Sequence, residues 1–206
     1  MPLKADWLDK MRKNVNPTMA TFVTLGINAD LTKYPRYYLF KLKETINLSD
    51  QTYKYLSISN YAADPTYSPK GKTAMTIQLP GDTYNFWKEA KEQGRYIEEK
   101  EKIAIVIKNA IATQIPEAEG KIEVCEIATP LTYERYCANW KGSWMTKIPK
   151  DMKIETYPPV IKGLEGVYFS GQRMSPPGGF PPALLTARMA VQHLCRDTDT
   201  FFVSEG

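Results

Sequence analysis

The residues best suited to chemistry lie near the end of the sequence, in a turn rich in glycine and proline. Gly171, Gly178 and Gly179 stand close to Pro177 and Pro181. If a helix follows, its first turn presents unpaired backbone N–H groups and a partial positive charge, which suit an anion or the carbonyl oxygen of a ring. Glycine lets such a ligand approach the backbone because it has no side chain. The turn therefore predicts a ligand site, although a Gly-Gly pair also forms plain connections.

The sequence has few residues that could bind a metal or serve as a catalytic histidine. The sequence has one histidine, His193, and three cysteines, Cys125, Cys137 and Cys195, and none of them falls into a CxxC or HxxxH spacing. This spacing excludes a structural zinc site, so we expect no metal. The odd cysteine count and the lack of a signal peptide at the start predict reduced thiols in a cytoplasmic protein. The sequence identifies no catalytic side chain.

Charge and hydropathy argue against two further classes of function. The 206 residues carry a net charge of +4, but lysine and arginine alternate with acidic residues, as in 88–92 and 98–102. Because no basic stripe stands beside aromatic residues, we expect no nucleic-acid partner. The longest apolar run, 103–107, is far shorter than the ~20 residues of a membrane span. We therefore expect peripheral contact with a membrane at most.

The elements that must position these residues begin with a sheet. Four runs rich in β-branched and aromatic residues, separated by turn residues, predict antiparallel strands in the first part of the chain. In the third run neither alternating face is clearly polar, so either both faces are covered or one faces a ligand. The expected strands cover residues 19–27, 37–43, 53–61 and 73–79.

In the middle of the chain, apolar residues recur at the spacing of an α-helix. A short helix is expected near residues 83–90, and a longer one over 96–115, which Pro116 ends. A strand over 121–128 and a helix over 131–137 come next. The buried stripe expected on the longer helix consists of Ile97, Ala104, Ile107, Ile111 and Ile115.

The last part of the sequence reads as a strand, a glycine turn and a helix. Residues 166–171 form a short apolar run closed by glycine, which is typical of a buried strand. Pro181 suits the first residue of the helix, because the N–H group at that position has no intrahelical partner. The whole pattern predicts an α+β fold. The helix would carry one apolar face, formed by Leu184, Ala187, Val191 and Leu194.

Three segments, in the same order along the chain, resemble a known family. Residues 128–143 read ATPLTYERYCANWKGS and resemble the "ATPxTYERYxGNWxGS" segment of the phytoene desaturase, carotenoid isomerase and retinol saturase family. Residues 64–73, DPTYSPKGKT, resemble its "DPTxAPxGKT" turn. YFSGQ at 168–172 and PPGGFPPA at 176–183 resemble its C-terminal flavin-binding signature, so the likeness covers about residues 16–203.

The resemblance implies an FAD-dependent oxidoreductase that desaturates, saturates or isomerises long apolar polyenes. It implies a mostly antiparallel substrate-domain sheet with helices in residues 1–147. Residues 148–206 would then be the C-terminal strand, turn and helix of a glutathione-reductase-like FAD domain. The substrate side would hold Thr129, Pro130, Asn139 and Trp140. The flavin side would hold Gly171, Gln172, Pro177, Gly178, Gly179, Phe180 and Pro181.

The chain departs from the family pattern in ways that bear on this expectation. Pro177 stands at the first of three glycines, and Ala138 and Ala187 each replace a glycine. The G-x-G-x-x-G motif that grips the ADP half of FAD is missing, so the resemblance implies an N-terminal partner chain or self-association. The alternative is a non-catalytic domain that binds an apolar ligand or another protein. A simple truncation would leave an exposed apolar surface where the missing domain docked.

Overall fold

The computed structural model describes residues 9, 12–13, 16–148, 150–151, 154 and 156–203, and within them the fold is α+β, as the sequence predicted. The chain divides into two compact units. One unit comprises residues 19–144. The other combines the described residues up to Thr18 with those from Met145 onward.

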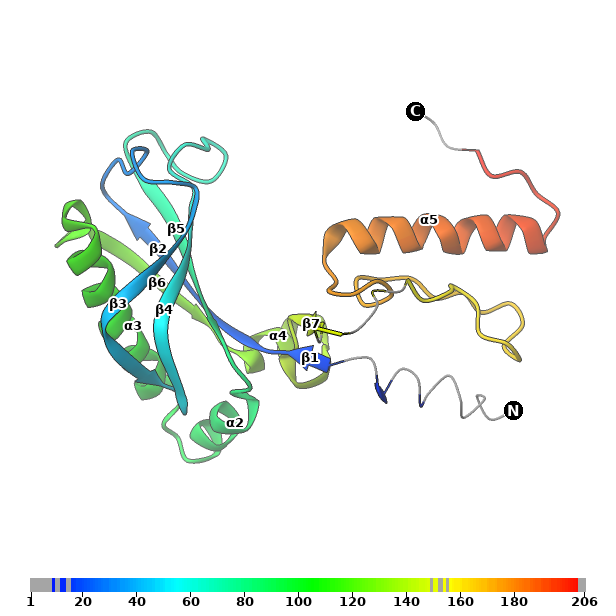
Figure 1. Cartoon of the computed structure of the whole chain (residues 1–206), viewed down its shortest axis with the longest axis horizontal. Coiled ribbons are helices and arrows are strands. Elements are labelled where there is room, and N and C mark those ends of the chain that lie inside the picture. Colours follow the sequence, from blue (N-terminus) through cyan, green and yellow to red (C-terminus); the bar gives the residue numbers. More distant parts are fainter. Residues whose placement is uncertain are drawn as a thin grey trace. The chain divides into compact units, whose positions relative to one another are not determined.

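A five-stranded antiparallel sheet forms the body of residues 19–144 (Figure 1). Its strand order is β3-β4-β5-β2-β6. β2, which comes first along the chain, therefore lies between β5 and β6, which come last. All five strands that the sequence predicted in this unit are present. Their bounds are β2 (Ala20–Ile27), β3 (Tyr37–Leu48), β4 (Gln51–Asn60), β5 (Thr73–Pro80) and β6 (Ile122–Ala128).

A two-residue turn joins β3 to β4. Leu48 pairs with Gln51, and the two residues between them, Ser49 and Asp50, have positive φ angles of 50° and 59°. Positive φ at both central residues is what a type I′ turn requires, and this turn matches the twist of the flanking strands. β3 is therefore longer than the strand expected to end at residue 43, and β4 begins two residues before the strand expected from residue 53.

Two helices pack on one face of the sheet. α2 (Tyr84–Glu92) buries Trp87, and α3 (Tyr96–Gln114), drawn in green, lies along the sheet in Figure 1. The ring of Trp87 meets the ring of Tyr96 edge-on, with 5.5 Å between the centroids. The side chains of both helices belong to the same apolar cluster as those of the strands. This cluster lies entirely within residues 19–144, so that unit contains a complete core of its own.

The stripe that α3 buries was predicted only in part. Ile107, Ile111 and Ile115 are buried as expected, but Ile97 is 61% exposed and Ile103, which was not predicted, is 1% exposed. Ile97 precedes Ile107 by ten residues, and at 3.6 residues per turn this places it about 80° away around the helix. The prediction of a buried Ile97 was therefore wrong.

Short elements connect and follow these helices. Pro116 ends α3, as expected, and begins a single 3-10 turn, η1 (Pro116–Ala118). The chain then passes through β6 into α4 (Pro130–Cys137), which starts one residue before the expected position. A second 3-10 turn, η2 (Trp140–Gly142), closes the unit.

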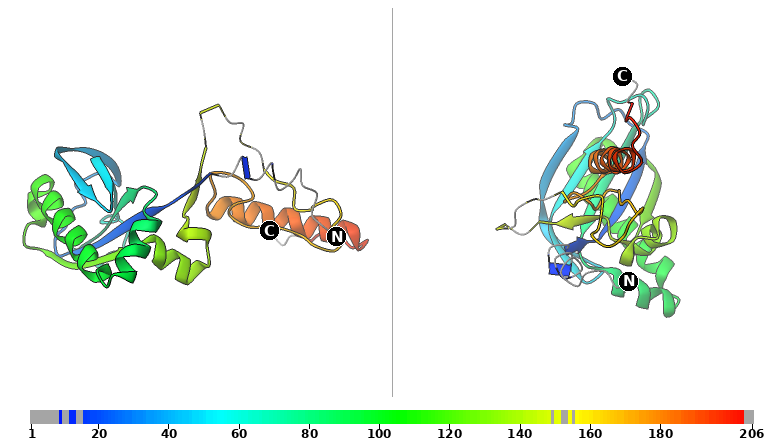
Figure 2. Two further views of the ribbon diagram at one scale, coloured as in Figure 1. Left: turned by 90° about the horizontal axis from the view of Figure 1, so that it is seen from below. Right: turned by 90° about the vertical axis from the view of Figure 1, so that its right-hand side faces the viewer.

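The second unit has little apolar packing. β1 (Asn16–Thr18) pairs with β7 (Met145–Lys147), and α5 (Phe180–Asp197), orange to red, lies alongside the segment that precedes it in Figures 1 and 2. Among the described residues of this unit, the buried hydrophobic side chains other than proline are Tyr157, Ile161 and Met174. The unit therefore contains a long helix but hardly any core to hold it.

Candidate functional site

The glycine turn before α5 has the backbone that the sequence indicated. Gly178 and Gly179 have φ angles of 110° and 105°, a region that L-residues rarely adopt, and the peptide bond between Pro176 and Pro177 is cis. A Cβ on Gly178 would lie 3.0 Å from the carbonyl oxygen of Gln172, so the two ends of the turn approach closely there. Glycine is thus required at 178 by both conformation and space.

The helix begins one residue earlier than predicted. Phe180, not Pro181, is its first residue, and Gly179 stands at the N-cap without a side-chain cap. Pro181 and Pro182 have no N–H groups, so the backbone donors at this helix end are those of Gly179 and Phe180. Phe180 is 74% exposed. The helix start therefore offers fewer hydrogen-bond donors to a ligand than an ordinary helix of this length.

A threonine that the sequence did not single out holds this turn against the helix. The hydroxyl of Thr186 accepts a hydrogen bond from the N–H of Gly171 at 3.0 Å, and it lies 2.8 Å from the carbonyl oxygen of Pro182. Thr186 is 1% exposed, and it is the buried residue of α5. A lone threonine within an apolar helical stretch was the signal that could have pointed to it.

The segment before the turn does not form the predicted buried strand. Residues 166–171 contribute one isolated antiparallel bridge, between Tyr168 and Val160, and Val167 is 42% exposed. A buried strand needs hydrogen-bonded neighbours, and the described part of this unit places no further strand beside the segment. The N–H of Phe169 donates to the carbonyl oxygen of Pro159 at 2.7 Å. The expectation of a strand here was therefore wrong.

The residues expected on the substrate side gather around α4. Thr129 is fully buried and caps the helix: its N–H donates to the Thr132 hydroxyl at 3.1 Å in a capping box. Pro130 is buried as the first helical residue. Asn139 is half-buried, and its amide nitrogen donates to the carbonyl oxygen of Ser143 at 3.1 Å. These three residues are therefore placed by local structural contacts.

Trp140 differs from its neighbours because it reaches into solvent. It is 64% exposed, and the Lys141 ammonium lies 5.0 Å from the centroid of its ring. Two residues after Trp140, Gly142 has a φ of 59°, and its α-carbon packs against the backbone of Pro130. Of the predicted substrate-side set, Trp140 is thus the member with a surface free to meet a ligand.

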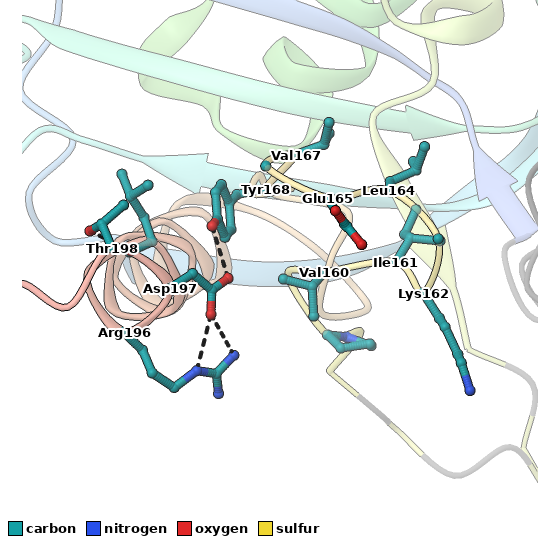
Figure 3. A pocket seen from close by; sticks show the side chains of 14 residues that line it. Val160, Ile161, Lys162, Leu164, Glu165, Val167, Tyr168, Arg196, Asp197 and Thr198 are labelled. Carbon is teal, nitrogen blue, oxygen red and sulfur yellow. Dashed lines mark hydrogen bonds and ion pairs between the residues drawn. The ribbon is translucent and has the colours of Figure 1, made fainter. Parts of the chain in front are cut away.

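A groove of about 950 Å³ lies in the second unit, between residues 158–168 and the C-terminal end of α5 (Figure 3). Its apolar wall includes Val160, Leu164 and Leu194. None of the residues expected on the flavin side lines it. The groove and the glycine turn are therefore separate features of this unit.

A carboxylate provides the polar contacts of the groove. The Tyr168 hydroxyl donates to Asp197 Oδ2 at 2.8 Å, and the Arg196 guanidinium donates to Asp197 Oδ1 at 3.2 Å (Figure 3). The hydrogen bond from Tyr168, followed by the pairing with Arg196, lowers the pKa of Asp197 below its ordinary value. The same hydrogen bond raises the pKa of Tyr168. The groove thus carries an ionised carboxylate whose oxygens are already engaged.

The apolar face expected on α5 is exposed rather than packed. Leu184, Val191 and Leu194 are 58%, 45% and 43% exposed, and beyond the helix Phe201 is 95% exposed. These apolar side chains of α5 and the segment after it are therefore in contact with solvent. The sequence pattern placed these residues on one shared face and did not indicate what would cover it.

Comparison with known proteins gives no assignment. No protein-family model matches the chain, and no curated protein matches it. Within the described residues, no three side chains of the metal-ligating types gather, and all three cysteines are free. None of the described helices has both the length and the apolar character that crossing a membrane takes.

Proposed function

We propose that this chain is the C-terminal part of an FAD-dependent oxidoreductase that acts on apolar polyenes by desaturation, saturation or isomerisation. The observation that carries the proposal is α5: it follows two glycines with φ above 100° and leaves an apolar face exposed in a unit that has almost no core. The three family-like segments support the assignment. The roles of residues 1–147 as a substrate domain and 148–206 as part of an FAD domain stay predictions.

The glycine turn fits the edge of a flavin ring. No heavy atom lies within 4 Å of the position of a Cβ on Gly171, and the nearest atom to one on Gly179 is 4.0 Å away, in Pro181. Backbone is therefore accessible at both glycines, where a ring edge would need close approach. Pro177, Phe180 and Gln172 would border the ring. FAD, when bound, would supply the oxidation and reduction chemistry.

The residues of this chain would mainly position the flavin and the substrate. Thr186 ties Gly171 to the first turn of α5, so it would fix the spacing between the two glycine segments. The N–H groups of Gly179 and Phe180 would donate to an electron-rich carbonyl or ring nitrogen. Trp140 would contribute an apolar surface toward the substrate. No side chain of the described residues is assigned a catalytic role.

A second polypeptide segment must complete this site. The exposed faces of α5 and of Val167 would pack against an N-terminal half that carries the missing nucleotide-binding motif, either in a partner chain or in a longer product of the same gene. Burying the apolar side chains of α5 would contribute roughly 25 cal/mol for each Å² removed from water. Self-association through this surface is the other way in which the chain would cover it.

The test is flavin retention after co-expression with a candidate N-terminal half. We expect the complex to elute from gel filtration with flavin absorbance, and Gly179→Val to abolish that absorbance. Gly163→Val is the matched control, because Gly163 also has a positive φ, 94°, and open space around it. A complex that forms without flavin absorbance, or equal loss in both variants, would contradict the proposal.

A second candidate is a non-catalytic domain that binds an apolar ligand or a protein. It is favoured by the complete core of residues 19–144 and by the uncovered face of their sheet, where Leu39 and Tyr55 are 64% and 49% exposed. Saturable binding of a retinoid by the full chain without FAD, weakened by Leu39→Ser and unchanged by Lys43→Gln, would support this function. Binding that requires FAD would favour the first.

A further inference from the structure

We propose that residues 19–144 contain a binding site for a phosphate-bearing anion, independent of the flavin proposal. The site is a pocket of about 470 Å³ where α2, α3, β6 and α4 meet. Three cationic side chains line it, and each comes from a different helix: Lys91, Lys100 and Arg135. All its lining residues belong to one compact unit.

The cations of this pocket are not neutralised by carboxylates. Within the described chain, none of Lys91, Lys100 and Arg135 forms an ion pair. By contrast, Arg95 at the N-cap of α3 and Lys102 on α3 both pair with Glu99. One carboxylate, that of Glu126, also lines the pocket. Three positive charges against one negative charge leave a net charge of +2. Like charges held together without partners repel one another, so an anion would relieve a cost that the free protein carries.

The hydrogen-bond donors of the pocket are partly free. The Arg135 guanidinium donates to the Tyr136 hydroxyl oxygen at 2.7 Å, which uses one of its five N–H groups and leaves the Tyr136 proton available to an anion. The Lys100 ammonium lies 5.5 Å from the centroid of the Tyr96 ring. Arginine and lysine with a phenol hydroxyl are groups that bind phosphate oxygens through charge-assisted hydrogen bonds.

The floor of the pocket adds an apolar element. Ile127 is buried, and Ala128 and Leu131 are half-buried beside it. Lys91 and Arg135 also line an adjoining hollow of about 520 Å³. Lys88, Glu92 and Glu134 line that hollow too, so its charge is nearly balanced and the uncompensated positive charge belongs to the first pocket. With its apolar floor, the first pocket fits a phosphate joined to an apolar group. The same chemistry is offered by a soluble phosphate ester and by an anionic lipid headgroup.

The experiment uses the full chain and two kinds of probe. Calorimetric titration with pyrophosphate and with inorganic phosphate measures soluble ligands, and flotation with phosphatidylcholine vesicles, with and without phosphatidic acid, measures lipid headgroups. We expect saturable pyrophosphate binding or selective flotation with phosphatidic acid. Each charge-assisted hydrogen bond lost should weaken binding by about tenfold or more, so Lys100→Gln and Arg135→Gln should each do so.

Lys43→Gln is the matched control, because Lys43 is an exposed lysine on β3 and does not line the pocket. It should leave binding unchanged, and thermal melting of every variant should match that of the parent protein. Binding by pyrophosphate alone would assign the pocket to a soluble ligand, and binding by vesicles alone would assign it to a headgroup. Absence of both, or an equal loss in Lys43→Gln, would overturn the proposal.

Discussion

A Cβ on Gly142 would lie 1.8 Å from the carbonyl oxygen of Pro130. Gly142 also has a φ of 59°, so glycine is required there for both space and backbone conformation. The contact holds the start of α4 against the turn that follows it. It therefore explains why residue 142, between the segment 128–137 and β7, is a glycine.

Gly142→Ala should destabilise the protein by about 3 kcal/mol or more, because it adds a steric clash with backbone to the strain of a left-handed alanine. Chemical denaturation measures the loss. Gly120→Ala is the control, since Gly120 has a φ of 67° but no heavy atom within 4 Å of its Cβ position. That variant should lose about 1 kcal/mol. Similar losses in both would show that the Pro130 contact does not matter.

Ile107→Ala should cost about 2–5 kcal/mol in the free energy of unfolding, because Ile107 is fully buried between α3 and the sheet. Ile105, two residues away on the same helix, is 61% exposed. Ile105→Ala should change stability by about 0.5 kcal/mol or less. Equal effects from the two substitutions would mean that α3 packs through a different face.

Thr186→Val should leave the N–H of Gly171 without its partner, at a cost of about 1–3 kcal/mol. Hydrogen exchange of the Gly171 amide, followed by NMR, measures the loss of protection directly. Thr186→Ser keeps the hydroxyl and should retain the slow exchange. An amide that exchanges at the same rate in the valine variant and the parent would contradict the contact.

Tyr53 should make the protein lose stability at alkaline pH. Burial raises the pKa of Tyr53 from 10 to about 12, because the ionised phenol is disfavoured away from water. The folded state thus holds a proton that the unfolded state releases, so this contribution is complete below pH 10 and is lost as the pH rises to about 12.

Tyr53→Phe has no proton to lose, so its stability should fall less steeply with pH over the same interval. Thermal melting at a series of alkaline pH values measures the slope. Tyr55→Phe is the control, because Tyr55 is on the same strand but is 49% exposed. A parent-like slope in Tyr53→Phe would count against the burial of this phenol.

Tyr168→Phe should raise the pKa of Asp197, because the hydrogen bond from the Tyr168 hydroxyl is the main cause that lowers it. NMR titration of the Asp197 carboxyl carbon reads this pKa directly. With the depressed pKa, the carboxylate stabilises the fold above the ordinary aspartate pKa, and the contribution disappears as the pH falls through the folded value. An unchanged titration midpoint would show that the hydrogen bond is absent in solution.

The elements of residues 19–144 could largely be predicted from the sequence. Strand residues rich in β-branched and aromatic side chains produced β2, β3, β4 and β5, because each is bounded by strong turn residues. The face of α3 was harder to predict. Isoleucine occurs on several sides of this helix, at 97, 103, 105 and 107, so periodicity alone does not determine which of them the sheet covers.

The second unit was predicted less well because its structure depends on contacts that sequence patterns do not show. An apolar run at 166–171 indicated a strand, but a strand forms only where a neighbour supplies hydrogen bonds. At the glycine turn, the role of residues 171–181 on the flavin side stays a prediction. Thr186, a lone threonine in an apolar helical stretch, was missed because its partner, the N–H of Gly171, lies fifteen residues earlier and periodicity does not show that contact.

The position of β2 has a consequence for how the protein emerges from the ribosome. Val23 pairs with Ile77 on one side and with Ile127 on the other, so β2 gains its neighbours only after residues 54 and 104 positions later have been synthesised. The β3–β4 hairpin can form early, but the sheet cannot close around β2 until β6 has left the exit tunnel. During that interval the edge of β2 that later pairs with β6 has no hydrogen-bonded neighbour.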